Sequence, residues 1–169
     1  MRAAILGGLL LVVAIPALPC ACVEPIGFNA RTAMSSVSIV FSGTVLKRET
    51  LPPRAEMKGR NRYAITFHVD EYWKGSPAKT VVIYGMDGGG DCLGDGGYLT
   101  GKQYLVYASR VEAKDVVFEA PTFFWYGWAD ILPAGTKMLV PETACMPGGE
   151  IHAVSAALHE LGKGGKPSR

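Results

Sequence analysis

Four cysteines are the residues whose type and spacing could do chemistry: Cys20, Cys22, Cys92 and Cys145. In an oxidising compartment, an even number of cysteines indicates a disulfide framework. Residues i and i+2 of an extended segment point to the same side, so Cys20 and Cys22 can both face the body of the protein. They are poorly placed to bridge each other, and we expect them to pair with Cys92 and Cys145. The alternative is a metal-binding Cys-x-Cys pair, but no other Cys or His stands near it at ligand spacing.

The N-terminal residues indicate export to such a compartment. Arg2 provides a positive charge, and residues 3–15 form an uncharged apolar run that ends at Pro16. This run is shorter than the ~20 residues that a membrane-spanning helix needs. We therefore predict a signal peptide over residues 1–19 and a secreted, periplasmic or extracellular protein. The alternative is a short N-terminal anchor.

The point of cleavage decides which residue becomes the new N-terminus. A cut before Cys20 leaves Pro19 at the last position of the signal, where a small residue is usual. Cuts after Ala17 or after Ala21 satisfy this rule as well or better. A cut after Ala21 would leave three cysteines, however, so the even count favours processing before Cys20. A lipoprotein signal would also need a small residue in place of Pro19.

Composition limits the class of protein. The chain has 169 residues, 49% of them hydrophobic and 19% charged, which fits one domain with a packed core. The 17 Lys and Arg residues nearly balance the 15 Asp and Glu residues, so nothing indicates a nucleic-acid partner. The 21 Gly and 11 Pro residues argue against an all-helical protein. No apolar segment after the signal is long enough to span a membrane.

Hydrophobic patterning predicts a β-rich domain over residues 20–162. Strands are expected over residues 37–45, 63–69, 80–84 and 104–109, with shorter ones over 116–118 and 138–140. Loops or turns are expected over residues 47–62, 73–77 and 87–97. Short helices are expected over residues 28–36 and 151–161, the second one ending at Gly162, and the tail over residues 163–169 is expected to be disordered. Many short strands and one terminal helix favour a small antiparallel barrel or sandwich.

Two details of the strands can be checked in a structure. Gly43 interrupts a β-branched run and predicts a bulge or a close approach of another backbone. Along the next strand, Tyr63, Ile65, Phe67 and Val69 alternate with smaller or polar residues and are expected to face the core. His68 belongs to the outward set.

Other polar residues have weaker claims to a site. His152 and His159 lie seven positions apart on one predicted helix face, near Glu160, where a solvated polar face is the simpler interpretation. Three aspartates lie in a glycine-rich loop, and their spacing matches no calcium motif that we can identify: Asp87, Asp91 and Asp95. No catalytic triad, carboxylate pair or nucleotide loop is visible, so the sequence does not indicate an enzyme.

A dense aromatic cluster occupies the region before the last predicted strand. Its members are Phe123, Phe124, Trp125, Tyr126 and Trp128. Such a cluster is either an extension of the core or an exposed patch that contacts a partner, because exposed aromatic side chains often mark contact surfaces.

Four motifs in order resemble the netrin-like module, in the form found in tissue inhibitors of metalloproteinases (TIMPs) and their bacterial relatives. The motifs are the CAC of residues 20–22, the FSGTV of 41–45, the WKG of 73–75 and the YLVYA of 104–108. The resemblance covers residues 20–162. It implies an all-β fold with flanking helices, namely an OB-like antiparallel β-barrel with a C-terminal α-helix. It also implies the disulfides Cys20–Cys92 and Cys22–Cys145.

The resemblance further implies a metalloprotease inhibitor without a cofactor or metal of its own. The free amine and carbonyl oxygen of Cys20 would chelate the zinc of the protease, which accepts nitrogen and oxygen ligands at about 2.0–2.2 Å. Ala21 would enter the specificity pocket, and Cys22, Val23 and the segment 47–62 would complete the inhibitory edge. The alternative is a non-inhibitory module that binds another extracellular or envelope protein through the barrel or the aromatic patch.

Mass spectrometry of the exported, non-reduced protein tests the N-terminal interpretation. We expect an unlipidated chain that begins at Cys20 and contains two disulfides. Free thiols, an acylated Cys20 or a different first residue would each contradict it.

Overall fold

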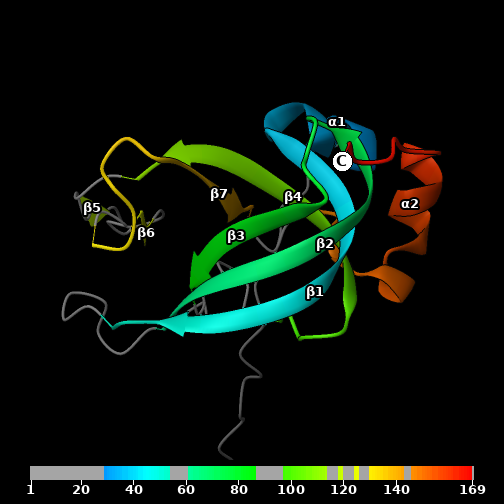
Figure 1. The fold of residues 1–169 in the computed structure, drawn as a ribbon. Coiled ribbons are helices and arrows are strands. Elements are labelled where there is room, and N and C mark those ends of the chain that lie inside the picture. Colours follow the sequence, from blue (N-terminus) through cyan, green and yellow to red (C-terminus); the bar gives the residue numbers. More distant parts are fainter. Residues whose placement is uncertain are drawn as a thin grey trace, which may run out of the picture.

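Five strands form a closed barrel, and two short helices pack on one side of it (Figure 1). The computed structural model describes residues 29–53, 61–86, 97–113, 118–119, 124–125, 130–142 and 146–168. The barrel strands are β1 (Ile39–Leu51), β2 (Arg62–Lys74), β3 (Thr80–Met86), β4 (Gln103–Glu112) and β7 (Lys137–Pro141). The remaining elements are α1 (Ala30–Ser36), β5 (Phe118–Glu119), β6 (Phe124–Trp125), β8 (Gly149–Glu150), the 3₁₀ turn η2 (Ile151–Ala153) and α2 (Ser155–Leu161).

The strand order is that of an OB-like barrel. The strands follow the order β1-β2-β3-β7-β4, and β1 pairs again with β4 to close the sheet. The neighbouring strands are antiparallel except β3 and β7, which pair in parallel. This arrangement confirms the predicted fold class, an OB-like antiparallel barrel with a C-terminal helix.

The barrel interior is built from the alternating residues of its strands. The predicted inward set on β2 is confirmed, since Tyr63, Ile65, Phe67 and Val69 are all buried, whereas His68 is exposed. Edge-to-face ring contacts connect Phe41 to Phe67, Phe67 to Tyr98, and Tyr98 to Tyr104. Such contacts contribute about 0.5–1.5 kcal/mol each beyond the burial of area.

A second cluster lies outside the barrel, beneath the helices. The outward-facing Val40, Leu105 and Tyr107 pack there against Ala33 of α1 and Leu161 of α2. Strand β4 is therefore buried on both faces, which explains its nearly continuous run of hydrophobic residues. The small alanines of both helices allow them to lie close to the sheet.

The two predicted helices form with one difference. Helix α1 begins after Asn29, whose side chain accepts hydrogen bonds from two backbone N–H groups in a capping box. At the C-terminal end, the predicted single helix is divided at Val154 into η2 and α2, which contradicts the continuous helical face expected from residue 151. Gly162 ends α2 with a φ of 70°, as expected. No helix in the described part of the chain is long and apolar enough to cross a bilayer.

The predicted loop over residues 47–62 is wrong at both ends. Strand β1 continues to Leu51 and pairs there with Arg62, so the described ends of this segment belong to a long hairpin. The extension was not predicted because it contains charged residues of low strand propensity. Pairing with β2 stabilises it as a strand. The Arg48 guanidinium lies 3.7 Å from the centre of the Tyr63 ring, and the buried Arg62 forms a two-pronged ion pair with Asp130. Similarly, β2 includes the first two residues of the turn expected over 73–77, so the chain turns only at Gly75.

The tail expected to be disordered lies instead against β2. Gly165 and Tyr72 exchange two backbone hydrogen bonds of 2.7 and 2.9 Å, and Ser168 forms a bridge with Ala78. A Cβ atom at Gly164 would lie 2.6 Å from the Tyr72 carbonyl oxygen, so this close approach needs glycine. The polar composition of the tail predicted disorder. Its order comes instead from pairing with a distant strand, which the local sequence does not indicate. We refer to residues 162–168 as the tail strap.

Gly43 meets both expectations made from the sequence. The register between β1 and β2 shifts there, and a Cβ atom would lie 2.6 Å from the His68 carbonyl oxygen. We predict that Gly43→Ala lowers the free energy of unfolding by about 1–3 kcal/mol, because the strands must separate locally. Urea denaturation measures this, and Gly97→Ala is the control, because a Cβ atom there meets nothing within 4 Å. Equal stability of the two variants would contradict the proposed close contact.

Candidate functional site

The cysteine-based inhibitory edge lies outside the described residues. This holds for Cys20, Ala21, Cys22 and Val23, and also for Cys92 and Cys145, so the disulfide pairing remains a prediction. The structure does describe the chain from Asn29 onward, with the surfaces that surround this residue.

The aromatic cluster is described only in part. Phe124 and Trp125 form strand β6, which pairs with β5 in a separate two-stranded sheet. Figure 1 shows this small sheet on the side of the barrel away from the two helices. Phe123, Tyr126 and Trp128 lie outside the described residues.

The polar candidates do not come together. His152 lies in η2 and His159 in α2, both are exposed, and the break at Val154 separates their elements. Within the described ranges, no group of three His, Cys, Asp or Glu side chains could hold a metal ion. The aspartates Asp87, Asp91 and Asp95 fall outside those ranges.

His152 instead lies beside an exposed ion pair. Lys102 Nζ and Glu150 Oε1 are 2.9 Å apart, and His152 Nδ1 is 3.6 Å from the same carboxylate oxygen. The hydrogen bond between Lys102 and Glu150 raises the pKa of the lysine and lowers the pKa of the glutamate. This network is exposed to solvent and contributes little to the free energy of unfolding.

The start of α1 is fastened to both α2 and the barrel. The Ala30 backbone N–H donates to Glu160 Oε2 at 2.8 Å, and Arg31 Nε donates to the Glu160 carbonyl at 2.6 Å. From the barrel, the Tyr107 hydroxyl donates to the Ala30 carbonyl at 3.1 Å. The first residues that the structure describes are therefore held in place by three hydrogen bonds.

The buried Tyr107 is the one strongly perturbed acid among these groups. Its side chain is 2% exposed, and burial together with the nearby Glu160 charge raises the pKa of the phenol from 10.0 to about 12. Both effects act in the same direction because each disfavours the phenolate. The hydroxyl therefore stays protonated, and can donate to Ala30, throughout the physiological pH range.

The WKG motif connects both helices to β2. Trp73 Nε1 donates to the Gly162 carbonyl at 2.7 Å, at the C-terminal end of α2. Lys74 Nζ donates to the carbonyls of Met34 and Ser35 at 2.8 and 3.0 Å, at the C-terminal end of α1. A cation is favourable at that end of a helix because of its unpaired carbonyls and dipole. The motif that looked like turn chemistry in the sequence thus fixes the positions of both helices.

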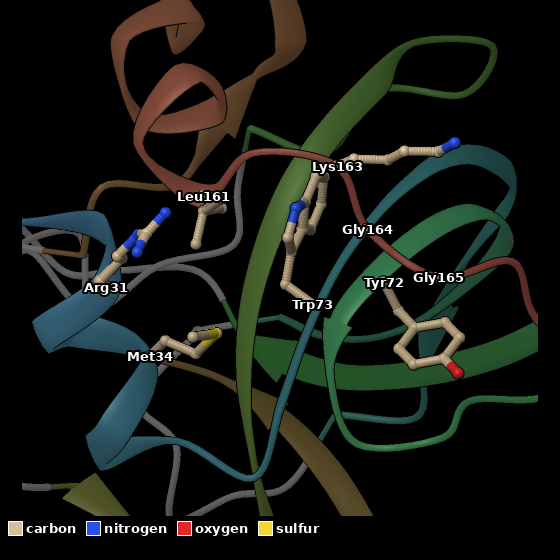
Figure 2. Close-up of a pocket in the computed structure, with 8 residues that line it drawn as sticks. All are labelled: Arg31, Met34, Tyr72, Trp73, Leu161, Lys163, Gly164 and Gly165. Atoms are coloured by element: carbon tan, nitrogen blue, oxygen red, sulfur yellow. The ribbon is translucent and has the colours of Figure 1, made fainter.

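An open groove of about 390 Å³ lies between α1, the end of β2 and the tail strap (Figure 2). Its lining residues are Arg31, Met34, Tyr72, Trp73, Leu161, Lys163, Gly164 and Gly165. Sequence reasoning did not find this groove, because its walls come from three distant segments. The one feature of the sequence that could have indicated the groove is Trp73, a large aromatic residue next to a turn.

Comparisons with protein-family models and with curated proteins return no match for this chain. Its function is therefore argued from the residues and their geometry.

A substitution at Tyr107 tests the attachment of α1. We predict that Tyr107→Phe lowers the free energy of unfolding by about 1 kcal/mol at neutral pH, because the Ala30 carbonyl loses its buried donor. In the wild type, the free energy of unfolding should also fall as the pH rises from 10 toward 12, since the phenol of Tyr107 loses its proton at a lower pH in the unfolded chain than in the folded one. The variant has no phenol at this position, so its free energy of unfolding should fall less over this range. Urea denaturation at about pH 8 and about pH 11 measures both effects, and identical pH dependence in the two proteins would contradict the assignment.

Proposed function

We propose that this chain is an exported, disulfide-bonded protein of the TIMP-like, netrin-like type that inhibits a zinc metalloprotease. The amine and carbonyl oxygen of Cys20 would bind the zinc of the protease, and Ala21, Cys22 and Val23 would extend along its active-site cleft. The observation that supports this most directly is the fastened start of α1, because it provides a fixed base for a short N-terminal edge.

The length of the chain is compatible with a Cys22–Cys145 bridge. Cys145 directly precedes Met146, which packs against the same outer cluster as Ala33 of α1. Cys22 lies seven positions before Asn29, and an extended segment of this length spans at most ~25 Å. The reach of this segment and the shared cluster are both compatible with a bridge between the two cysteines.

A bridge from Cys20 to Cys92 would involve the other end of the same edge. Cys92 lies five positions before Gly97, whose carbonyl accepts a hydrogen bond of 2.7 Å from the Tyr104 hydroxyl. Tyr98 packs against the barrel core next to it. The described residues that follow Cys92 are thus attached to the barrel within a few positions of the cysteine.

Two such bridges would make the chelating group rigid before it meets the protease. An α-amino group has a pKa of about 8, so it can release its proton to a metal near neutral pH. Fixing Cys20 in advance lowers the entropy lost on binding, which is the usual reason for affinity in a preorganised inhibitor. The zinc belongs to the protease, and the inhibitor needs only its own main-chain atoms.

The test compares two recombinant proteins that differ by a single residue. One begins at Cys20, and the other carries an additional alanine before Cys20. We predict that the first inhibits one or more members of a panel of zinc metalloproteases, and that the extra residue weakens inhibition on the order of a hundredfold or more, because it removes the amine from the zinc. Circular dichroism and intact mass confirm that both proteins have the same fold and disulfides.

Two results would contradict the proposal. One is equal inhibition by both proteins, which would exclude the amine chelate. The other is no inhibition of any protease in the panel, with binding to an envelope or extracellular protein that Trp125→Ala and Trp128→Ala abolish. The second result would identify the non-inhibitory binding module.

A further inference from the structure

We propose that the groove between α1, the end of β2 and the tail strap binds a small anionic amphiphile, namely a carboxylate on an unbranched alkyl chain. This site is separate from the proposed inhibitory edge and does not depend on inhibition. The proposal rests on an apolar wall that includes the fixed ring of Trp73, on the Arg31 guanidinium beside it, and on the backbone pairing of the neighbouring strand edge.

The apolar wall consists of Met34, Trp73 and Leu161 (Figure 2). The indole N–H of Trp73 is already bonded to the Gly162 carbonyl, so the ring cannot turn freely and its apolar surface lines the groove. Met34 is half-buried, and its unbranched thioether adapts to an alkyl chain. A groove of about 390 Å³ falls within the range of small-molecule sites, which is roughly 300–1,000 Å³.

The Arg31 guanidinium is the group at the groove that favours an anion. The described lining residues include Arg31 and Lys163 but no acidic side chain, and Figure 2 shows the Lys163 side chain extending away from Met34 and Leu161. Two carboxylates that lie next to lining residues in the sequence accept backbone hydrogen bonds: Glu160 accepts from the Ala30 N–H, and Glu71 accepts from the Gly164 N–H. The hydrogen bond from Arg31 Nε to the Glu160 carbonyl holds the guanidinium beside the groove. A carboxylate bound there gains a charge-assisted hydrogen bond.

The strand edge beside the groove argues against a peptide as the ligand. An extended peptide gains affinity by pairing its main chain with an unoccupied strand edge. At Tyr72 that edge is occupied, because Gly165 of the tail strap forms both backbone hydrogen bonds. An alkyl chain needs no backbone partner, so it matches a groove that offers apolar side chains, with the Arg31 guanidinium beside them for its carboxylate.

Titration with dodecanoate below its micelle concentration tests the proposal, with ¹H–¹⁵N spectra of the full mature protein as the readout. We expect the indole N–H signal of Trp73, assigned by its loss in Trp73→Phe, to shift in a saturable manner. Arg31→Gln should weaken binding about tenfold, since it removes a charge-assisted hydrogen bond. Arg110→Gln is the matched control, because Arg110 is exposed on β4 and does not line the groove.

A second measurement guards against a folding defect in the arginine variant. Dodecyltrimethylammonium has the same alkyl chain and the opposite charge, and it should bind the wild type about tenfold more weakly than dodecanoate does. The proposal would be overturned if the Trp73 signal did not shift, or if the two amphiphiles bound equally. Equal or tighter binding of an acidic peptide of Glu and Leu would identify a peptide site instead. A shift that depends on protein concentration without any probe would identify a contact between two copies of the chain.

Discussion

The burial of β4 on both faces is the constraint on which the rest of the structure depends. Inside the barrel, Tyr104 and Val106 belong to the core, whereas Leu105 and Tyr107 face outward. Exposing that outward face would cost about 25 cal/mol for each Å² of apolar surface, so something must cover it. The two helices do so. Their presence follows from the same strand that closes the barrel against β1.

Covering this face creates a seam between helices and barrel, and most of the distinctive polar contacts lie along it. Trp73, Lys74 and Tyr107 each send a side-chain donor from a strand to a helix-end or helix carbonyl. The bonds from Trp73 and Lys74 satisfy carbonyls at the C-terminal ends of the helices, which a helix leaves unpaired. Helices of seven residues are too short to be stable alone, so their order comes from these contacts and from packing.

The seam also connects the two proposed sites. The same Glu160 that holds the start of α1 through Ala30 also accepts, through its backbone carbonyl, the bond from Arg31 at the groove. The proposed inhibitory edge would extend from one side of α1, and the groove lies between α1 and the tail strap. Both therefore depend on how firmly α1 is seated on the barrel.

The sequence by itself determined the strands of the core, the presence of a short helix before the first strand and the need for glycine at position 43, because period-two burial and residue type are local signals. The extension of β1 through Lys47 and Arg48, the division of the last helix and the ordering of the tail were decided by tertiary structure alone. The first and the last of these depend on a partner elsewhere in the chain: Tyr63 for Arg48, and Tyr72 for Gly165. The groove was invisible for the same reason, since pairing and packing across long sequence separations leave no periodic pattern in the residues that take part.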